Sequence, residues 1–209
     1  MTRRRWQLLV VATVAAAVAW ATMAVARVDG VILDRPAVVQ AFTLDDHNGK
    51  PFTADSLKGH WSLILAGFTN CPDVCPFTLA NLEQVVAELG LRVRPDRLPT
   101  VIFLAVDPDR DRPNLKDYVV QFHPDFIGVT GAIDQIDRAL KGIDAVAVRA
   151  KPDARGNYQV THSAAVAVID PQGRLVAKIS PPFEPAPTAQ FLADLFHQRE
   201  NARAPGSGQ

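Results

Sequence analysis

Two runs of apolar residues in the first half of the chain have the length of buried β-strands. They cover residues 61–68 and 100–106. Each run is followed by a segment with apolar residues at helical spacing, 76–89, which opens on Pro76, and 113–122. Because continuously apolar strands that alternate with helices are typical of parallel sheets, we expect a sheet that is covered on both faces.

The second half of the chain has a different order of elements. A third helix is predicted over about 133–143, and apolar runs at 164–169 and 175–179 predict an antiparallel hairpin that precedes a helix capped by Thr188. Near the N-terminus, an Asn-Gly turn within 41–53 predicts another hairpin. The pattern therefore predicts an α/β protein of the thioredoxin-like fold, a β-α-β half followed by a β-β-α half, with an N-terminal β-hairpin extension.

A long apolar stretch without charged residues lies at the N-terminus, from Trp6 to Ala26, directly after Arg3, Arg4 and Arg5. Its length suits a transmembrane helix, and the arginines predict that the N-terminus is cytoplasmic. The sequence Ala-Val-Ala at 24–26 also matches a signal-peptide cleavage site. Both interpretations place the rest of the chain outside the cytoplasm.

The composition indicates a single core with appendages. The chain has 209 residues, of which 48% are hydrophobic, so one domain is the simplest expectation. Basic and acidic residues balance at 22 each, and without the arginines of the anchor the exported part is slightly acidic, which argues against nucleic acid as a partner. We expect an anchor or signal peptide at 1–27, a linker at 28–39, the thioredoxin-like domain at 40–198 and a disordered tail at 199–209.

The chain has two cysteines, Cys71 and Cys75, which lie between the first predicted strand and its helix. Because backbone N–H groups at a helix start favour negative charge, a thiolate should form there more easily than on a free cysteine. As a structural crosslink, so small a ring would contribute only about 2 kcal/mol. A redox or metal-binding role is therefore favoured over a structural disulfide or a pair of inert thiols.

Four segments together closely resemble the Sco/SenC family of copper-delivery proteins. The likeness spans about residues 40–198 and rests on Gly-Phe-Thr-Asn-Cys-Pro-Asp-Val-Cys-Pro at 67–76, Val-Asp-Pro-Asp-Arg-Asp-Arg-Pro at 106–113, Phe-His-Pro-Asp-Phe-Ile-Gly-Val-Thr-Gly at 122–131 and Thr-His-Ser at 161–163. The resemblance implies a copper chaperone, single-pass in the bacterial inner membrane, with its copper-binding domain in the periplasm. It implies as partners the CuA-bearing subunit of cytochrome c oxidase and another copper carrier.

Carried over residue by residue, the family's copper ligands are Cys71, Cys75 and His162. Two thiolates suit Cu(I), and an added imidazole allows the same site to hold Cu(II). The family often has Asp before this histidine, where the chain has Thr161. The other histidines have surroundings typical of solvated or capping side chains; they are His47, His60, His123 and His197.

Other functions fit the same cysteines. The main rival is a membrane-tethered thiol–disulfide oxidoreductase that uses the redox-active pair Cys71 and Cys75 to reduce an apo-metalloprotein. A thiol peroxidase would need only one attacking cysteine with a supporting Thr and Arg, and Thr69 alone gives this alternative little support. A zinc site with a further ligand fits the residue types. The acidic and basic run at 107–113 is interpreted as a solvated loop in which Asp111 caps a helix that starts at Pro113.

Overall fold

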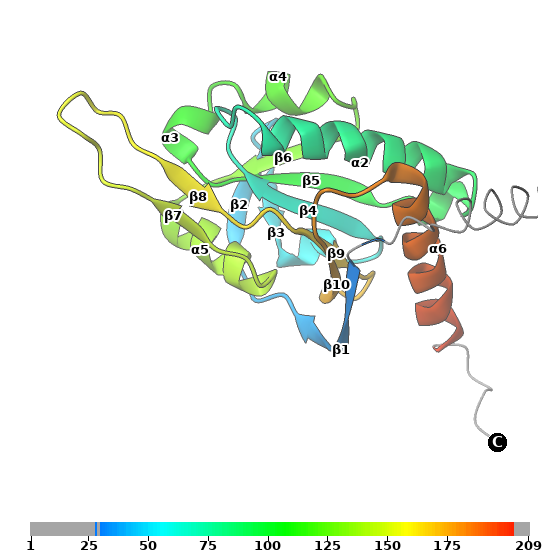
Figure 1. Cartoon of the computed structure of the whole chain (residues 1–209). Coiled ribbons are helices and arrows are strands. Elements are labelled where there is room, and N and C mark those ends of the chain that lie inside the picture. Colours follow the sequence, from blue (N-terminus) through cyan, green and yellow to red (C-terminus); the bar gives the residue numbers. More distant parts are fainter. Residues whose placement is uncertain (1–27, 29, 203–209) are drawn as a thin grey trace, which may run out of the picture.

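The structure is a computed structural model that describes residue 28 and residues 30–202 (Figure 1). The predicted anchor at 1–27 and the last seven residues of the predicted tail lie outside the described residues. No helix within the described part of the chain is both long enough and apolar enough to cross a membrane.

An eight-stranded mixed sheet forms the centre of the domain. Its strand order is β1-β10-β9-β4-β5-β6-β2-β3, and β4, β5 and β6 run parallel to one another. The strands of this sheet are β1 (Gly30–Val38), β2 (Thr43–Asp46), β3 (Pro51–Thr53), β4 (Ser62–Gly67), β5 (Thr100–Ala105), β6 (Ile127–Thr130), β9 (Val166–Ile169) and β10 (Arg174–Ile179). A separate two-stranded sheet pairs β7 (Ala147–Arg149) with β8 (Val160–His162).

Helices cover both faces of the sheet, as the apolar strands predict (Figure 1). On β4, Leu63 and Leu65 pack into a core with helices α2, α4 and α6, whereas Ile64 and Ala66 face the second core with α5. The helices are α2 (Val74–Gly90), α3 (Pro108–Asp111), α4 (Leu115–Val120), α5 (Ile133–Gly142) and α6 (Pro185–Asn201), with 3-10 turns at η1 (Ala54–Leu57) and η2 (Pro95–Arg97).

The predicted α/β architecture is confirmed, including the N-terminal hairpin. Strands β2 and β3 pair antiparallel across the Asn-Gly turn, where Gly49 has a φ of 77° that favours glycine. The C-terminal hairpin of β9 and β10 is likewise antiparallel.

Several predicted boundaries are wrong. The stretch 28–39, expected as a linker, contains β1, which pairs with β10 at the edge of the sheet. Most of its side chains are exposed and it includes Pro36, so the hydrophobic pattern gave no sign of a strand. The predicted disordered tail from 199 is also wrong for its first residues, because α6 continues to Asn201.

Helix starts differ from the prediction because prolines fit anywhere in the first turn, where backbone N–H groups lack helical partners. Helix α2 begins at Val74, two residues before Pro76. Helix α6 begins at Pro185, so Thr188 lies inside its first turn and is buried. The helix expected from Pro113 to 122 is instead two short helices, α3 and α4, on either side of this proline.

Candidate metal centre

The two cysteines lie where β4 gives way to α2. Cys71 is half-buried in the connecting loop, and its N–H donates to the carbonyl of Phe68 at 3.1 Å. Cys75 lies in the first turn of α2 and is fully buried. A Cβ atom on Gly67, the last residue of β4, would lie 2.8 Å from the Cys75 Sγ. Glycine therefore allows the strand to approach the sulfur closely.

His162 reaches the cysteines from the other side of the junction. It ends β8, where it pairs with Ala147 of β7. Its Nδ1 lies 3.0 Å from the carbonyl oxygen of Ser163, and because a carbonyl can only accept, Nδ1 carries the proton of the neutral ring. The Nε2 atom then presents its lone pair towards the Cys75 Sγ, 3.3 Å away. The ring packs edge-on against Phe68, with centroids 5.7 Å apart.

The fold brings together all three predicted site residues. One potential ligand atom each of Cys71, Cys75 and His162 lies within 4.8 Å of the other two, a spacing that lets one metal ion touch all three. Two sulfurs and an imidazole nitrogen form a donor set suited to a soft cation such as Cu(I). In the described part of the chain, no other group of three or more Cys, His, Asp or Glu side chains converges in this way.

The other histidines have different roles. The Nδ1 of His47 accepts from the N–H of Gly128 at 3.0 Å, and the Nδ1 of His123 accepts from the N–H of Asp125 at 3.1 Å. His197 is exposed on α6. None of these side chains joins the group of the two cysteines and His162.

The electrostatics of Cys75 contradict the expectation that its thiolate forms easily. Burial raises the pKa of the Cys75 thiol, and the neighbouring Cys71 and Asp111 raise this pKa further. A hydrogen bond with the backbone of Phe68 lowers it, but by less than burial raises it. Loss of water around the sulfur thus outweighs the favourable helix start, and a bound cation would supply the missing stabilisation of the thiolate.

The run at 107–113 is not the solvated loop that was expected. Asp107 and Asp111 are both buried. The Oδ1 of Asp111 accepts from the N–H and the hydroxyl of Thr69 at 2.7 and 2.9 Å, and its Oδ2 accepts from the N–H of Asp107 at 2.9 Å. Asp111 therefore orders the loop that leads to Cys71 instead of capping a helix. The signal in the sequence was the position of this run, directly after the parallel strand next to β4.

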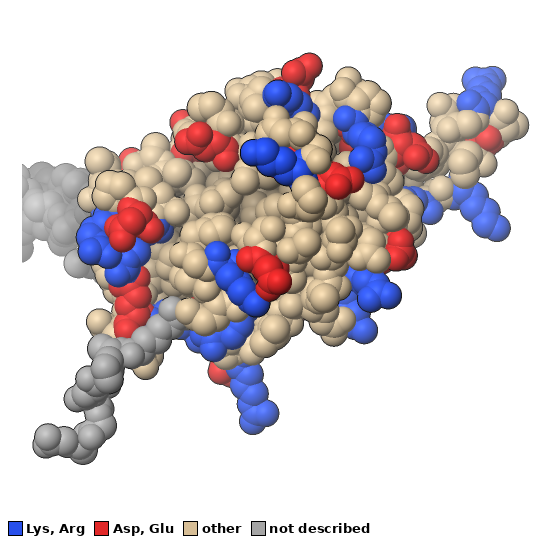
Figure 2. Space-filling view, turned by 180° about the vertical axis from the view of Figure 1, so that it is seen from behind, with Lys and Arg blue, Asp and Glu red and all other residues tan. Residues whose placement is uncertain are grey.

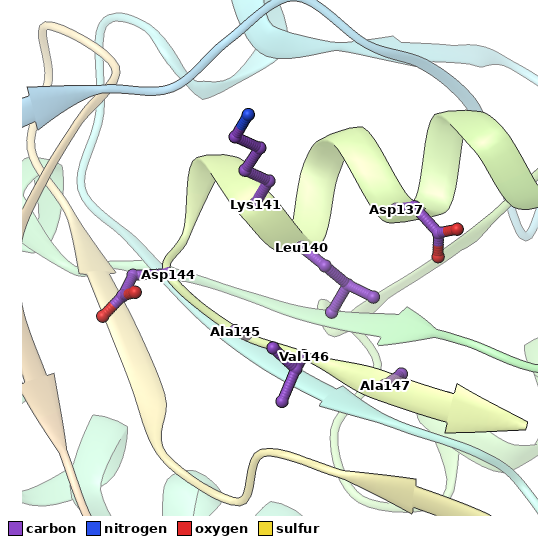
Figure 3. A pocket seen from close by; sticks show the side chains of 7 residues that line it. All are labelled: Asp137, Leu140, Lys141, Asp144, Ala145, Val146 and Ala147. Atoms are coloured by element: carbon purple, nitrogen blue, oxygen red, sulfur yellow. The ribbon is translucent and has the colours of Figure 1, made fainter.

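A hollow of about 340 Å³ lies between α5 and β7, and the cysteines and His162 are not among its lining residues. Figure 3 shows the side chains that line it. Its two carboxylates are already paired, Asp137 with Arg149 and Asp144 with Lys178. The hollow therefore offers no second set of converging ligands. It is lined by Asp137, Leu140, Lys141, Asp144, Ala145, Val146 and Ala147.

Comparisons with known proteins agree with the resemblance in the sequence. The family model described as SCO1/SenC matches residues 32–197. A SCO2-like protein of Rickettsia felis is 38% identical over 153 residues, which cover 72% of this chain and 73% of that protein. The structure of Bradyrhizobium japonicum ScoI with copper bound has a TM-score of 0.66 and 33% identity, covering 76% of this chain and 99% of that one.

A second structure with copper bound, Arabidopsis thaliana ScoI, has a TM-score of 0.70 and 26% identity, covering 78% of this chain and 99% of that one. The family match takes in the β4–α2 junction, the run at 107–113 and the strand that ends at His162. The chain belongs to the SCO1/SenC family.

Proposed function

We propose that this protein binds one copper ion through Cys71, Cys75 and His162, and that it delivers the metal to the CuA site of cytochrome c oxidase or prepares that site. The convergence of these three ligand atoms within 4.8 Å carries the proposal. Two relatives of known structure, both ScoI proteins, hold copper. Delivery to the oxidase rests on the resemblance to the Sco/SenC family.

The exposure of the site suits a metal that is passed on. Cys75 is buried, whereas Cys71 and His162 are each partly exposed. A partner can therefore approach the copper from the side of these two ligands while Cys75 holds it from within. Two thiolates stabilise Cu(I), and the imidazole extends the site to Cu(II), so the cargo can be carried in either oxidation state.

The geometry favours metal binding over thiol–disulfide exchange as the main activity. The attacking thiol in exchange reactions is an accessible thiolate, a role that the buried Cys75 with its raised pKa does not suit, so exchange would have to start at the partly exposed Cys71. Exchange also needs no imidazole, whereas the His162 Nε2 lies 3.3 Å from the Cys75 sulfur. A histidine that offers a lone pair beside two sulfurs is better explained as a metal ligand.

A transfer assay separates delivery from thiol reduction. The copper-loaded protein is mixed with the apo CuA domain of an oxidase whose cysteines are already reduced, and CuA formation is followed by its absorption spectrum. We expect metallation of the domain, and none when the donor is the His162→Ala protein loaded under the same conditions. A parallel reaction uses the CuA domain with its cysteines oxidised. If the copper-loaded protein does not metallate the reduced domain but does reduce the oxidised one, the result would instead support a thiol–disulfide oxidoreductase.

The proposed location follows from the N-terminal sequence. The apolar stretch 6–26 would tether the copper site to the periplasmic face of the bacterial inner membrane, with Arg3, Arg4 and Arg5 setting the orientation. A tether would keep the donor close to a membrane-bound oxidase and raise its effective concentration there.

A further inference from the structure

His162 lies on a hairpin that is not part of the main sheet. Strands β7 and β8 pair only with each other, and the segment between them projects from the body of the domain (Figure 1). Residues 150–157 of this segment are exposed. The position of His162 relative to the cysteines therefore depends on what fastens the hairpin to the rest of the protein.

Tyr158 fastens β8 to the segment after β5. This residue precedes the strand by two positions, and its hydroxyl donates to the Oδ1 of Asp107 at 2.5 Å. The guanidinium of Arg110 lies over the Tyr158 ring, 3.9 Å from the centroid, and its Nη1 donates to the Tyr158 carbonyl at 3.4 Å. The Nε of Arg110 donates to the Oδ2 of Asp107, so the three side chains form a closed set of contacts.

We call the contacts among Asp107, Arg110 and Tyr158 the latch. Its burial and its charged hydrogen bonds favour a fixed geometry. Asp107 is buried, where a charged hydrogen bond is stronger than in water. Burial and the bond to Asp107 raise the pKa of Tyr158, so its hydroxyl keeps the proton that it donates.

The segment that contains Asp107 also contacts the loop that leads to Cys71. Asp111, one helical turn after Asp107, accepts two hydrogen bonds from Thr69 in the loop before Cys71. The N–H of Asp107 donates to Asp111, which joins the two contacts. A single short segment at 107–111 therefore contacts both the loop of the cysteines and the hairpin of the histidine.

We propose that Asp107, Arg110 and Tyr158 are positioning residues that hold His162 at copper-binding distance from the two cysteines. The inference rests on the proposed copper site and goes beyond its ligands, because none of the three belongs to the ligand group. Tyr158 lies four residues before His162 and two before the start of β8, so losing its hydroxyl bond removes one attachment of the strand that carries the imidazole.

The test is a double-mutant cycle between Tyr158→Phe and His162→Ala. The phenylalanine keeps the ring beneath Arg110 and removes only the hydroxyl. Cu(I) affinity is measured against a competing chelator in both backgrounds. We expect Tyr158→Phe to weaken binding about tenfold when His162 is present, as is typical for residues that orient metal ligands. In the His162→Ala background it should change nothing, because no imidazole remains to be positioned.

A second readout reports His162 directly. In the Cu(II) form, the nitrogen hyperfine coupling in electron paramagnetic resonance should weaken in Tyr158→Phe, and Asp107→Asn should repeat both effects. The control is Asp153→Asn, which changes the exposed tip of the same hairpin, where Asp153 accepts from the N–H groups of Arg155 and Asn157. This variant should bind copper like the wild type. Circular dichroism checks that each variant is folded.

Two results would contradict the positioning role of the latch while leaving the proposed copper site unaffected. Either Tyr158→Phe binds like the wild type although His162→Ala binds more weakly, or Tyr158→Phe weakens binding equally in both backgrounds, which marks a general structural role. If His162→Ala itself has no effect, the proposed ligand set is wrong and the latch fails with it.

Discussion

At the level of single residues, His47 should make the stability of the protein depend on pH. Burial lowers the pKa of His47 below its ordinary value of 6.5, and Lys116 lowers this pKa further, against an opposing effect of Asp46. Its unprotonated Nδ1 accepts from the Gly128 N–H. The neutral ring therefore stabilises the fold above about pH 6.5, and this contribution is lost as the pH falls through the lowered pKa.

The variant His47→Asn isolates this contribution, since the Asn Oδ1 can accept the same hydrogen bond but does not titrate. Urea unfolding between about pH 7.5 and pH 5 should show a smaller loss of stability in the variant than in the wild type. His197→Asn, at an exposed position, should follow the wild type. Equal losses in His47→Asn and the wild type would contradict the assignment.

Only some residues of the site could be predicted from the sequence. Cys71 and Cys75 stand out because the chain has no other cysteine, but His162 is one of five histidines and was selected only by the family resemblance. Asp107, Arg110 and Tyr158 could not be assigned, because the contacts of the latch join positions about 50 residues apart and exist only in the folded chain. The raised pKa of Cys75 likewise depends on burial, which the local helix start does not reveal.

At the level of elements, the predictions succeeded where burial is complete. Strand β9 is continuously apolar, as are β4 after Ser62 and β5 after Thr100, and every residue of β4 and β9 is buried. Most of the missed strands lack this signal; the exception is β6, a short strand with three of its four residues buried. Strands β7 and β8 have three residues each and are only partly buried, and β1 is largely exposed at the sheet edge.

The missed elements have functional consequences. The hairpin of β7 and β8 carries His162, and the short helix α3 together with its N-cap residue Asp107 supplies the acidic side chains that contact both halves of the site. The charged run at 107–113 is the segment interpreted from the sequence as a solvated loop, because the partners of a charged side chain cannot be recognised from local sequence. The core of the fold was therefore easier to predict than the elements that complete the site.

At the level of the whole molecule, basic and acidic side chains are interspersed on the face that Figure 2 shows, so neither sign of charge dominates that face.

The proposed location of the protein depends on its N-terminal segment. If residues 6–26 anchor the chain, the protein should stay with membranes during a carbonate wash, and its intact mass should include residues 1–26. Release into the wash, or a mature chain that begins at Arg27, would show that Ala-Val-Ala at 24–26 is a cleavage site.

Copper affinity of the ligand variants tests the account most directly. Cu(I) is titrated against a competing chelator into the reduced domain without residues 1–26, as wild type and with Cys71→Ser, Cys75→Ser or His162→Ala. We expect one copper per chain in the wild type and a loss of affinity of more than about tenfold in each variant, since removing a ligand should cost at least as much as disturbing its support. The controls His47→Ala and His197→Ala should bind like the wild type. Equal affinity in the wild type and all three ligand variants would contradict the proposed copper site.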